Sequence, residues 1–586
     1  MRYSRKKFKP GKIRLRILLV GIFFTLLYCG IAGRVVYLQV VCGDMLASRA
    51  SGQYTRTLVT SGKRGTIYDR NHTELAVTVD ATSIGIHPSL IPNSVEVAPK
   101  LARALNMETK AVRSKLISRQ PFVWLKRAAM ADEVSAVKQL NLAPEAIAYV
   151  PEQRRVYPGN AMAAQLIGFT GIDGNGLEGI EFTWDEYLRG ASVRQTILMD
   201  AKKRRLGAGE ELSGSVDGHN VVLTIDGAIQ YIAETALEKA VVDSDADHGM
   251  AIVMDPNTGE ILAMANYPFF DLNRFGDYHR DLWRNRVVAD AFEPGSVMKV
   301  FLAAGSIESG MCTPDTVFDC ENGAYRIHGH TINDTHRHGW MTVRDIIKTS
   351  SNIGAVKISE KIGRKMLWEI LRNFGFNTKP EVECPGNAEG RLSYYTQWTD
   401  VDMSTIAFGQ GISATAVQLV TAVSAIANGG LLMKPYVVSS VVSPDGQVAR
   451  RRDREIVRRV ISETTAEHLK EMMTGVTTEG GTGVNAAVEG YSVCGKTGTA
   501  QKLDKDGRYS NRDYISSFLG FAPQHNPRVA VMVIVDSPRK AYYASVVAAP
   551  AFKQIVRETL NYFGVLPETD HAGKNLMVQA DGGGNG

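Results

Sequence analysis

The pattern of apolar and polar residues first separates a membrane segment from a long mixed region. Residues 17–33 form an uncharged apolar run at the short limit for a membrane-spanning helix, and residues 35–41 could prolong it. From residue 42 onward, short strand-like stretches alternate with helices such as 95–105 and 131–140. The pattern therefore predicts a transmembrane helix at 17–41 and a segment of mixed strands and helices at 42–217.

A different pattern begins near residue 218 and predicts an α+β domain over 218–566. Its strands are expected at 220–224, 251–254, 261–265, 491–495, 516–521 and 528–535, and its helices at 227–241 and 550–563. The second and third strands would form a hairpin that pairs with the later strands in one antiparallel sheet, on which the last helix packs. Residues 567–586 end in a glycine-rich sequence and are predicted to be a disordered tail.

Composition indicates a large, mostly soluble protein. The chain has 586 residues, of which 44% are hydrophobic and 22% charged, so it is too long for a single core and two or three domains are expected. Its net charge is +6, and a basic cluster within residues 1–16 accounts for that excess. Without the cluster the charge is near zero, so the sequence gives little support to nucleic-acid binding.

The basic cluster also predicts how the chain crosses the membrane. Because lysine and arginine favour the cytoplasmic side, residues 1–16 are expected to be a cytoplasmic tail and everything after the membrane helix to lie outside. A cleaved signal peptide is the alternative, since Gly30-Ile31-Ala32 places small residues at a suitable cleavage position. The length of the apolar run favours an uncleaved anchor.

The spacing Ser296-x-x-Lys299 is a candidate nucleophile and base. The same spacing occurs by chance elsewhere, as at Ser4 and Ser135, but only Ser296 follows a turn sequence and opens an apolar helical run. Residues three apart share one face of a helix, so the Lys299 amine can reach the Ser296 hydroxyl. Desolvation and a nearby cation such as Lys496 would lower the lysine pKa and allow it to take the serine proton.

The triplet Ser350-Ser351-Asn352 is the second candidate motif. In a turn or extended loop its first and third side chains would point into one cleft, where Ser350 could relay protons and Asn352 could hold a substrate amide. Taken alone, the triplet is more typical of a helix cap or a turn. It therefore supports a catalytic site only in combination with the other motifs.

The third motif, 496–499 (KTGT), follows the strand expected at 491–495. An edge strand at this place could present backbone and hydroxyl donors to a ligand with a carboxylate. Residues 490–497 also match the phosphate-binding pattern G-x-x-x-x-G-K-[ST], but the loop is not glycine-rich and a polar turn follows in place of a helix. Nucleotide binding is therefore not predicted.

In this order and at these separations, the three motifs resemble those of the penicillin-binding protein and serine β-lactamase superfamily. Further segments are similar to class B penicillin-binding proteins, namely 64–70 (RGTIYDR), 155–158 (RVYP), 176–181 (GLEGIE) and 408–411 (FGQG). The resemblance extends from the membrane segment to about residue 565. The chain length and residues 33–39 are most similar to the septum-specific transpeptidases of that class.

The resemblance implies an architecture and a reaction. An elongated α+β pedestal of the penicillin-binding protein dimerisation type would occupy 42–217, and a β-lactamase/transpeptidase-like domain with a central antiparallel sheet and an all-helical subdomain would occupy 218–566. The protein would be a peptidoglycan D,D-transpeptidase of the inner membrane in septal cell-wall synthesis, with its catalytic domain in the periplasm. Its partners would be stem peptides (a D-Ala-D-Ala donor and an amine acceptor), β-lactams, a membrane glycan polymerase and other division proteins. No cofactor, metal or nucleic acid is implied.

The resemblance also implies a role for each motif residue. Ser296 would be the nucleophile and Lys299 its base. Ser350 and Lys496 would move protons on the leaving-group side, and Asn352 would hold the donor amide. The backbone N–H groups of Ser296 and Thr499 would form the oxyanion hole. The residues expected to bind substrate or β-lactam are Ser351, Thr497, Gly498 and Thr499.

Three other functions share parts of this pattern. A β-lactamase or D,D-carboxypeptidase would pass the acyl group to water, and class A β-lactamases need a further glutamate that has no counterpart identified in this sequence. A β-lactam sensor would have the same pocket, but such receptors usually carry several membrane segments. A non-catalytic division scaffold would keep the fold alone, which the intact motifs argue against.

Cysteines and histidines add weaker expectations. Six cysteines are too few for a disulfide framework, although Cys312 and Cys320 could pair in an oxidising compartment. Four histidines between residues 328 and 338 invite a zinc site, but only Asp334 could complete the ligand set. These histidines are therefore predicted to be solvated loop residues.

Overall fold

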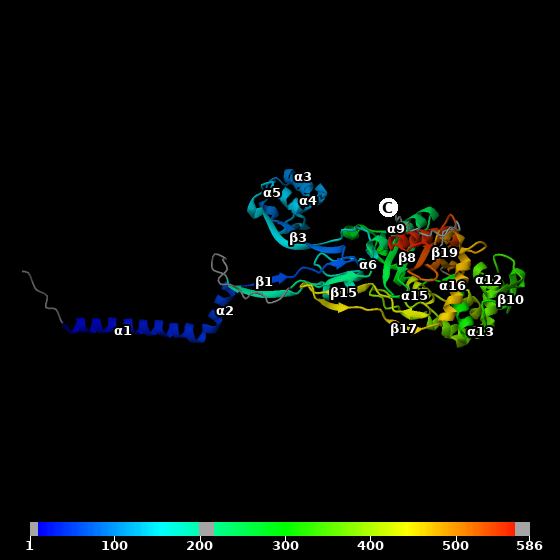
Figure 1. Cartoon of the computed structure of the whole chain (residues 1–586). Helices are drawn as coiled ribbons and strands as arrows, with labels where there is room; N and C mark the ends of the chain where they lie inside the picture. Colours follow the sequence, from blue (N-terminus) through cyan, green and yellow to red (C-terminus); the bar gives the residue numbers. More distant parts are fainter. Residues whose placement is uncertain (1–9, 199–215, 505, 569–586) are drawn as a thin grey trace, which may run out of the picture. The chain divides into compact units, whose positions relative to one another are not determined.

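The computed structural model describes residues 10–198, 216–504 and 506–568, and the chain divides into two compact units (Figure 1). The first unit consists of Met1–Gly62 and Ala191–Val216, and the second of Lys63–Gly190 and Asp217–Gly586. Most of the predicted basic tail and nearly all of the predicted disordered tail lie outside the described residues. The first unit holds the membrane segment, and the second holds all three candidate motifs.

The first unit begins with the predicted apolar helix. Helix α1 (Pro10–Val36) continues into η1 (Tyr37–Val41), and the stretch Ile13–Val41 is long and apolar enough to cross a membrane. Its large apolar side chains are exposed, as lipid contact requires. Helix α2 (Gly43–Tyr54) leads to β1 (Thr55–Ser61), which pairs antiparallel with β6 (Ser192–Leu198). Helix α1 together with η1 therefore fits a single-pass membrane anchor.

A seven-stranded sheet in the second unit joins segments from both sides of the boundary expected at 217/218. Its order is β16-β15-β7-β2-β3-β4, and β5 pairs with β3. The strands are β2 (Ile67–Tyr68), β3 (Glu74–Ile86), β4 (Val123–Ala129), β5 (Ile147–Val156), β7 (Asn220–Leu223), β15 (Val438–Val442) and β16 (Val448–Arg451). Strand β2 lies parallel to β7, with Ile67 opposite Val221. The pedestal region thus shares backbone hydrogen bonds with the following domain.

Three helices near the C-terminal end of β3 form a separate small core with it. The helices expected at 95–105 and 131–140 are α3 (Ser94–Ala104) and α5 (Ala131–Lys138), and α4 (Thr109–Leu116) lies between them in sequence. Their buried apolar residues cluster with Ile84 and Ile86 from β3 and with Leu125 from β4. This cluster is separate from the cores of the domain that carries the motifs.

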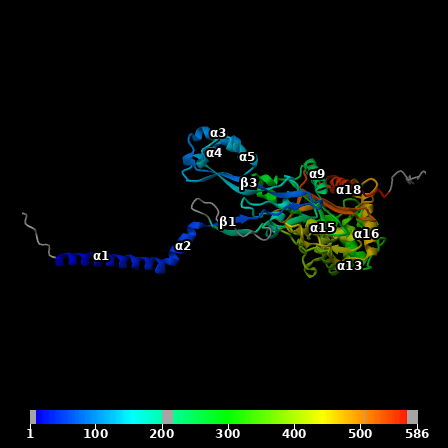
Figure 2. The same cartoon turned by 60° about the vertical axis from the view of Figure 1, so that its left-hand side comes forward.

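The predicted antiparallel sheet is present and has five strands in the order β18-β19-β20-β8-β9. The strands are β8 (His248–Met254), β9 (Ile261–Tyr267), β18 (Cys494–Leu503), β19 (Tyr509–Ala522) and β20 (Val529–Asp536). Helices α9 (Gly227–Ser244) and α18 (Ala549–Tyr562) lie side by side and pack on one face of this sheet (Figure 2). The α+β class, with the last helix on the sheet, is therefore confirmed.

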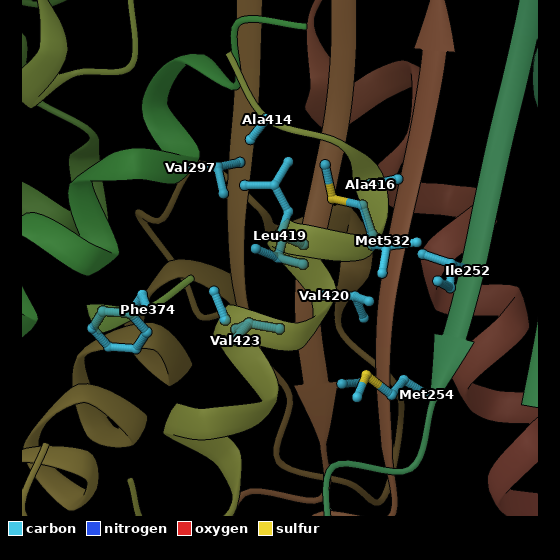
Figure 3. Packing of buried hydrophobic residues seen from close by; sticks show 14 of the residues in the cluster. Ile252, Met254, Val297, Phe374, Ala414, Ala416, Leu419, Val420, Val423 and Met532 are labelled. Atoms are coloured by element: carbon cyan, nitrogen blue, oxygen red, sulfur yellow. The ribbon is translucent and has the colours of Figure 1, made fainter. Parts of the chain in front are cut away.

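A block of helices packs on the other face of the same sheet. Every residue of α15 (Ala416–Ala427) is buried, as expected for a helix that is apolar on all sides. It packs against β8 and β20, and Figure 3 shows Val420 on the side of Met532 and Val423 on the side of Phe374. The other main helices of the block are α11 (Met298–Glu308), α12 (Val343–Thr349), α13 (Asn352–Asn373), α14 (Asp400–Ala407) and α16 (Glu463–Thr477). This block is the predicted all-helical subdomain.

Shorter elements connect these parts. They are α6 (Ala164–Ile167), α7 (Gly179–Thr183), α8 (Asp185–Leu188), α10 (Arg286–Ala289), α17 (Ala544–Val547), β10 (Val317–Asp319), β11 (Ala324–Ile327), β12 (His330–Asn333), β13 (Trp340–Thr342), β14 (Leu431–Met433) and β17 (Ile456–Arg459).

Strand β18 differs from the expected strand at 491–495. It runs from Cys494 to Leu503, so the motif 496–499 lies inside the strand and not after it. The reason is a long hairpin, because β18 pairs with β19 from Cys494 opposite Phe521 to Leu503 opposite Tyr509. Backbone pairing carries the strand through a polar stretch whose composition alone is typical of a turn. As β18 is the first strand in the sheet order, its other edge is free to face the helical block.

Candidate active site

Ser296 lies in the 3₁₀ turn η6 (Gly295–Val297), which continues directly into α11. Residues three apart are eclipsed in a 3₁₀ turn, so Lys299 falls on the same side of the chain as Ser296. Gly295 has a φ of +58°, a value that a residue with a Cβ rarely adopts, and its N–H donates to Gly409 O at 3.1 Å. Helix α11 is fixed behind the turn because its first nine residues are buried.

The Lys299 side chain is completely buried, and its amine contacts the second motif. It donates to the Ser350 carbonyl oxygen and to Asn352 Oδ1, both at 2.7 Å, and lies 3.3 Å from Ser350 Oγ. Ser296 is half-buried, and within the described part of the chain its hydroxyl has no hydrogen-bond partner. The structure therefore brings Lys299, Ser350 and Asn352 together at the base of the nucleophile turn.

The fold of the second motif explains which of its side chains reach Lys299. Ser350 ends α12 in the left-handed conformation, with a φ of +65°, and Ser351 is the N-cap of α13. This reversal turns Ser350 and Asn352 toward the amine. Ser351 is buried and donates to Asp334 Oδ2 at 2.5 Å, which places its hydroxyl away from the amine. Its expected role in substrate binding therefore has no support from its contacts.

The third motif supplies a second buried amine. The Lys496 side chain is completely buried, and its Nζ lies 3.4 Å from both the carbonyl oxygen and the hydroxyl of Thr497. Thr497 Oγ1 is 2.9 Å from the hydroxyl of Thr482, and Thr499 Oγ1 accepts from Ala544 N at 3.4 Å. Both threonine hydroxyls are thus oriented by neighbouring segments.

Gly498 allows β18 to approach the nucleophile turn. A Cβ at this position would lie 2.4 Å from Ser517 Oγ and 2.8 Å from both Pro294 O and Val297 Cγ2. Such contacts are far below van der Waals distances, so only glycine permits this packing. The edge of β18 therefore lies directly against the turn that carries Ser296.

Burial changes the protonation of both lysines. It lowers the pKa of Lys299 to about 7, although the Asp334 carboxylate partly opposes the decrease. Burial also lowers the pKa of Lys496 well below its usual value, and repulsion from Lys299 lowers it further. A substantial fraction of Lys299 is therefore neutral near pH 7 and able to accept a proton.

Several residues at the site were not identified from the sequence. The sequence indicates Asp334 only as a possible zinc ligand, and no motif includes Thr482. Next to the site, Tyr514 of β19 stacks on Tyr542 with ring centroids 4.4 Å apart, and the Tyr542 and Tyr543 rings lie 4.5 Å apart. The Tyr542 carbonyl is held by Ser516 Oγ at 2.5 Å on β19. Neither motif spacing nor periodicity signals Asp334 or Thr482 as residues of the site.

Cys312 and Cys320 are separate, buried free thiols, so the suggested disulfide is absent from this structure. His328 Nε2 is 2.9 Å from Asp400 Oδ2, and the rings of His336 and His338 are 6.4 Å apart. Within the described ranges, no group of three or more His, Cys, Asp and Glu side chains is arranged to hold a metal.

Comparison with known proteins relates both regions to described families. Residues 249–557 match the family described as penicillin binding protein transpeptidase domain, and residues 59–223 match the penicillin-binding protein dimerisation domain. The chain is 33% identical over 565 residues to the probable peptidoglycan D,D-transpeptidase PenA of Neisseria meningitidis serogroup B, covering 95% of this chain and 94% of the relative. It is 32% identical over 605 residues to the peptidoglycan D,D-transpeptidase FtsI of Escherichia coli K12, covering 100% of both.

A solved structure is similar over most of the chain. Penicillin-binding protein 3 from Mycobacterium tuberculosis, crystallised in complex with aztreonam, has a TM-score of 0.69 and 28% sequence identity. The similarity covers 87% of this chain and 98% of that one.

Proposed function

The chain belongs to the class B penicillin-binding proteins, and from this we propose that it is a peptidoglycan D,D-transpeptidase that cross-links stem peptides through an acyl-enzyme on Ser296. One observation carries the assignment of the site. The Lys299 amine is fully buried, has a lowered pKa and sits three residues after Ser296, between Ser350 and Asn352. This arrangement supplies a serine nucleophile with a base and needs no histidine.

In the first step, neutral Lys299 takes the proton of the Ser296 hydroxyl as Ser296 Oγ attacks the penultimate D-alanine carbonyl of a stem peptide. The N–H groups of Ser296 and Thr499 would donate to the oxyanion, at the start of a helix whose dipole also favours negative charge. When the C–N bond breaks, the proton passes through Ser350 or Lys496 to the departing D-alanine amine. The product is an ester on Ser296.

In the second step, an amine from a neighbouring stem attacks that ester and forms the cross-link. The amine loses a proton, and Ser296 Oγ regains one through Lys299 as the ester bond breaks. A β-lactam would open by the same attack on its ring amide, but its leaving nitrogen stays attached to the acyl group. We therefore expect a β-lactam adduct to block the acceptor and to persist.

The proposed substrate contacts use hydrogen-bonding groups of the motifs that can still bind a ligand. Asn352 uses Oδ1 for Lys299 and one N–H for Asn333 O at 3.0 Å, which leaves its other N–H for the donor peptide. Thr497 and Thr499 would bind the terminal carboxylate with their hydroxyls. Gly498 would contribute by allowing close approach of β18.

Cellular placement is also part of the proposal. The N-terminal basic cluster supports a cytoplasmic N-terminus, with the catalytic domain in the periplasm. Similarity to FtsI supports a role in septal synthesis. The resemblance of the sequence to septum-specific transpeptidases is the basis for proposing a membrane glycan polymerase and other division proteins as partners. Depletion should then produce filamentous cells, whereas rounded, lysed cells would contradict the septal role.

The deciding experiment is intact mass spectrometry of the full chain in detergent after addition of a penicillin. A single adduct that lasts for hours and is absent from Ser296→Ala is the expected result. Ser135→Ala is the matched control, because Ser135 precedes Lys138 at the same spacing on the distant helix α5. An adduct lost within seconds while hydrolysed drug accumulates would favour a β-lactamase, and no adduct at all would favour a scaffold.

A further inference from the structure

We propose that Asp334 is a positioning residue for this reaction, whose carboxylate holds the 350–352 segment in place and supplies the negative charge that faces Lys299. The inference rests on the proposed function, because it assigns Lys299 the role of base. Asp334 makes no contact with Ser296 and acts through its neighbours. Its side chain meets the second motif from a separate loop.

Both oxygens of the Asp334 carboxylate accept hydrogen bonds from the start of α13. Oδ2 accepts from Ser351 Oγ at 2.5 Å, and Oδ1 accepts from the backbone N–H groups of Asn352 at 2.5 Å and Ile353 at 3.1 Å. The first N–H groups of a helix have no acceptor within it, so they need a partner of this kind. A carboxylate is the favoured partner because of the helix dipole.

The same loop also holds the side chain of Asn352. Asn333, the residue before Asp334, accepts from Asn352 Nδ2 at 3.0 Å, and Asn352 Oδ1 then accepts from Lys299 at 2.7 Å. Backbone and side chain of Asn352 are therefore both fixed by two consecutive loop residues. Asn352 Oδ1, which accepts from the Lys299 amine, is therefore held in a defined position.

The conformation of Ser350 requires such support. Its φ of +65° is unfavourable for a residue with a Cβ and persists only when the surroundings fix it. Asp334 is anchored independently of α13, since it follows β12 and its own N–H donates to Gly323 O at 3.1 Å. The hairpin β11–β12 thus provides an external support for the strained turn.

The charge of Asp334 gives the proposal a measurable consequence. The charged groups that act on Lys299 from neighbouring elements are Asp334 and, on β18, Lys496. Because a negative charge favours the ammonium form, removing it would lower the Lys299 pKa further. Neutral Lys299 would then persist at more acidic pH, and the acidic limb of the acylation profile would move to lower pH. A purely structural residue would not cause such a shift.

The test measures the acylation rate of the full chain in detergent by a fluorescent penicillin between pH 5 and pH 9. Asp334→Asn keeps an oxygen for the two backbone N–H groups, so its plateau rate should fall less than about tenfold while its acidic midpoint moves down by about one pH unit. Asp334→Ala loses the hydrogen bonds as well, and its plateau should fall by more than about tenfold. Asp315→Asn is the matched control, because that side chain is 81% exposed and 3.9 Å from its partner Arg344.

The two Asp334 variants test the role of the charge and the role in positioning separately. An Asp334→Asn midpoint equal to that of the unmodified chain would overturn the role of the charge. An Asp334→Ala plateau equal to that of the unmodified chain would overturn the role in positioning. If the unmodified chain itself forms no adduct, the proposed function fails and the inference fails with it, whereas an acylated chain with unshifted variants removes the inference alone.

Discussion

Replacement of Glu181 by glutamine is expected to destabilise the second unit by about 3–5 kcal/mol. The Glu181 carboxylate is fully buried between two guanidinium groups, with its oxygens 2.6 Å from Arg64 Nε and 2.6 Å from Arg155 Nε. The arginine side chains are only 6% and 5% exposed. Glutamine preserves the shape but removes the charge and replaces one acceptor by a donor. One buried cation is then left without compensation.

Most of the lost free energy of unfolding should come from the uncompensated charge of Arg155. Arg64 keeps an ion pair with Asp185 at 2.5 Å, whereas among the described residues Arg155 keeps only the Gly65 carbonyl at 2.8 Å and the Thr78 hydroxyl at 2.9 Å. One Arg155 nitrogen, Nη2, is already buried with no partner among the described residues. A buried guanidinium with neutral acceptors alone explains why the loss should exceed that of an ordinary hydrogen bond, which is about 1 kcal/mol.

Urea unfolding of the purified chain, followed by tryptophan fluorescence, would measure the change, since the buried Trp184 lies three residues after Glu181. Asp80→Asn is the control, because it breaks the exposed pair with Lys63 at 2.9 Å and should cost less than about 1 kcal/mol. If Glu181→Gln costs no more than this control, the buried ion cluster does not stabilise the unit and the reasoning is refuted. Acylation of Ser296 under native conditions should be unchanged, because none of these residues contacts the three motifs.

Three further predictions concern the site and its support. Since acylation needs neutral Lys299 with a pKa of about 7, its rate should fall about 100-fold between pH 8 and pH 5, and a flat profile would contradict this role. Gly498→Ala should reduce acylation by at least about 100-fold through displacement of β18; Gly276→Ala, which meets nothing within 4 Å, should have no effect on the same labelling assay. Phe301→Ala should cost about 3–5 kcal/mol in thermal denaturation, because its buried ring packs 5.0 Å from that of Phe374 and 5.1 Å from that of Phe376, and a cost under about 1 kcal/mol would exclude the expected cavity.

The parts of the fold that depend on short-range patterns could be predicted from the sequence. Helices α9 and α18 follow from a local helical pattern of apolar residues, and strands β8, β9 and β20 follow from short apolar runs. The antiparallel pairing of β8 with β9 follows from the hairpin between them. The same holds for the relation between Ser296 and Lys299, which needs only one helical turn. Neither a partner distant in sequence nor knowledge of the core is required for these steps.

Long-range backbone pairing could not be predicted in the same way. Strand β2 has two residues, and its place beside β7 depends on a segment far along the chain, with Ile67 opposite Val221. Strand β18 continues through a polar stretch because β19 lies beside it, which composition does not reveal. In both cases tertiary contacts override local preference. A boundary set at 217/218 therefore divides residues that the structure joins in one sheet.

The second motif illustrates why the groups that support a site are harder to find than the groups that react. Alternation along an extended loop predicts that the Ser350 and Asn352 side chains face one way, and in the structure Lys299 Nζ lies 3.3 Å from Ser350 Oγ and 2.7 Å from Asn352 Oδ1. The prediction requires no knowledge of Ser351, whose hydroxyl is bound by Asp334 from another loop. Reacting groups must be of particular types at particular spacings, but a supporting group needs only an acceptor at the right place in space. Asp334 meets that requirement through the fold of a hairpin, so motif spacing alone could not have revealed it.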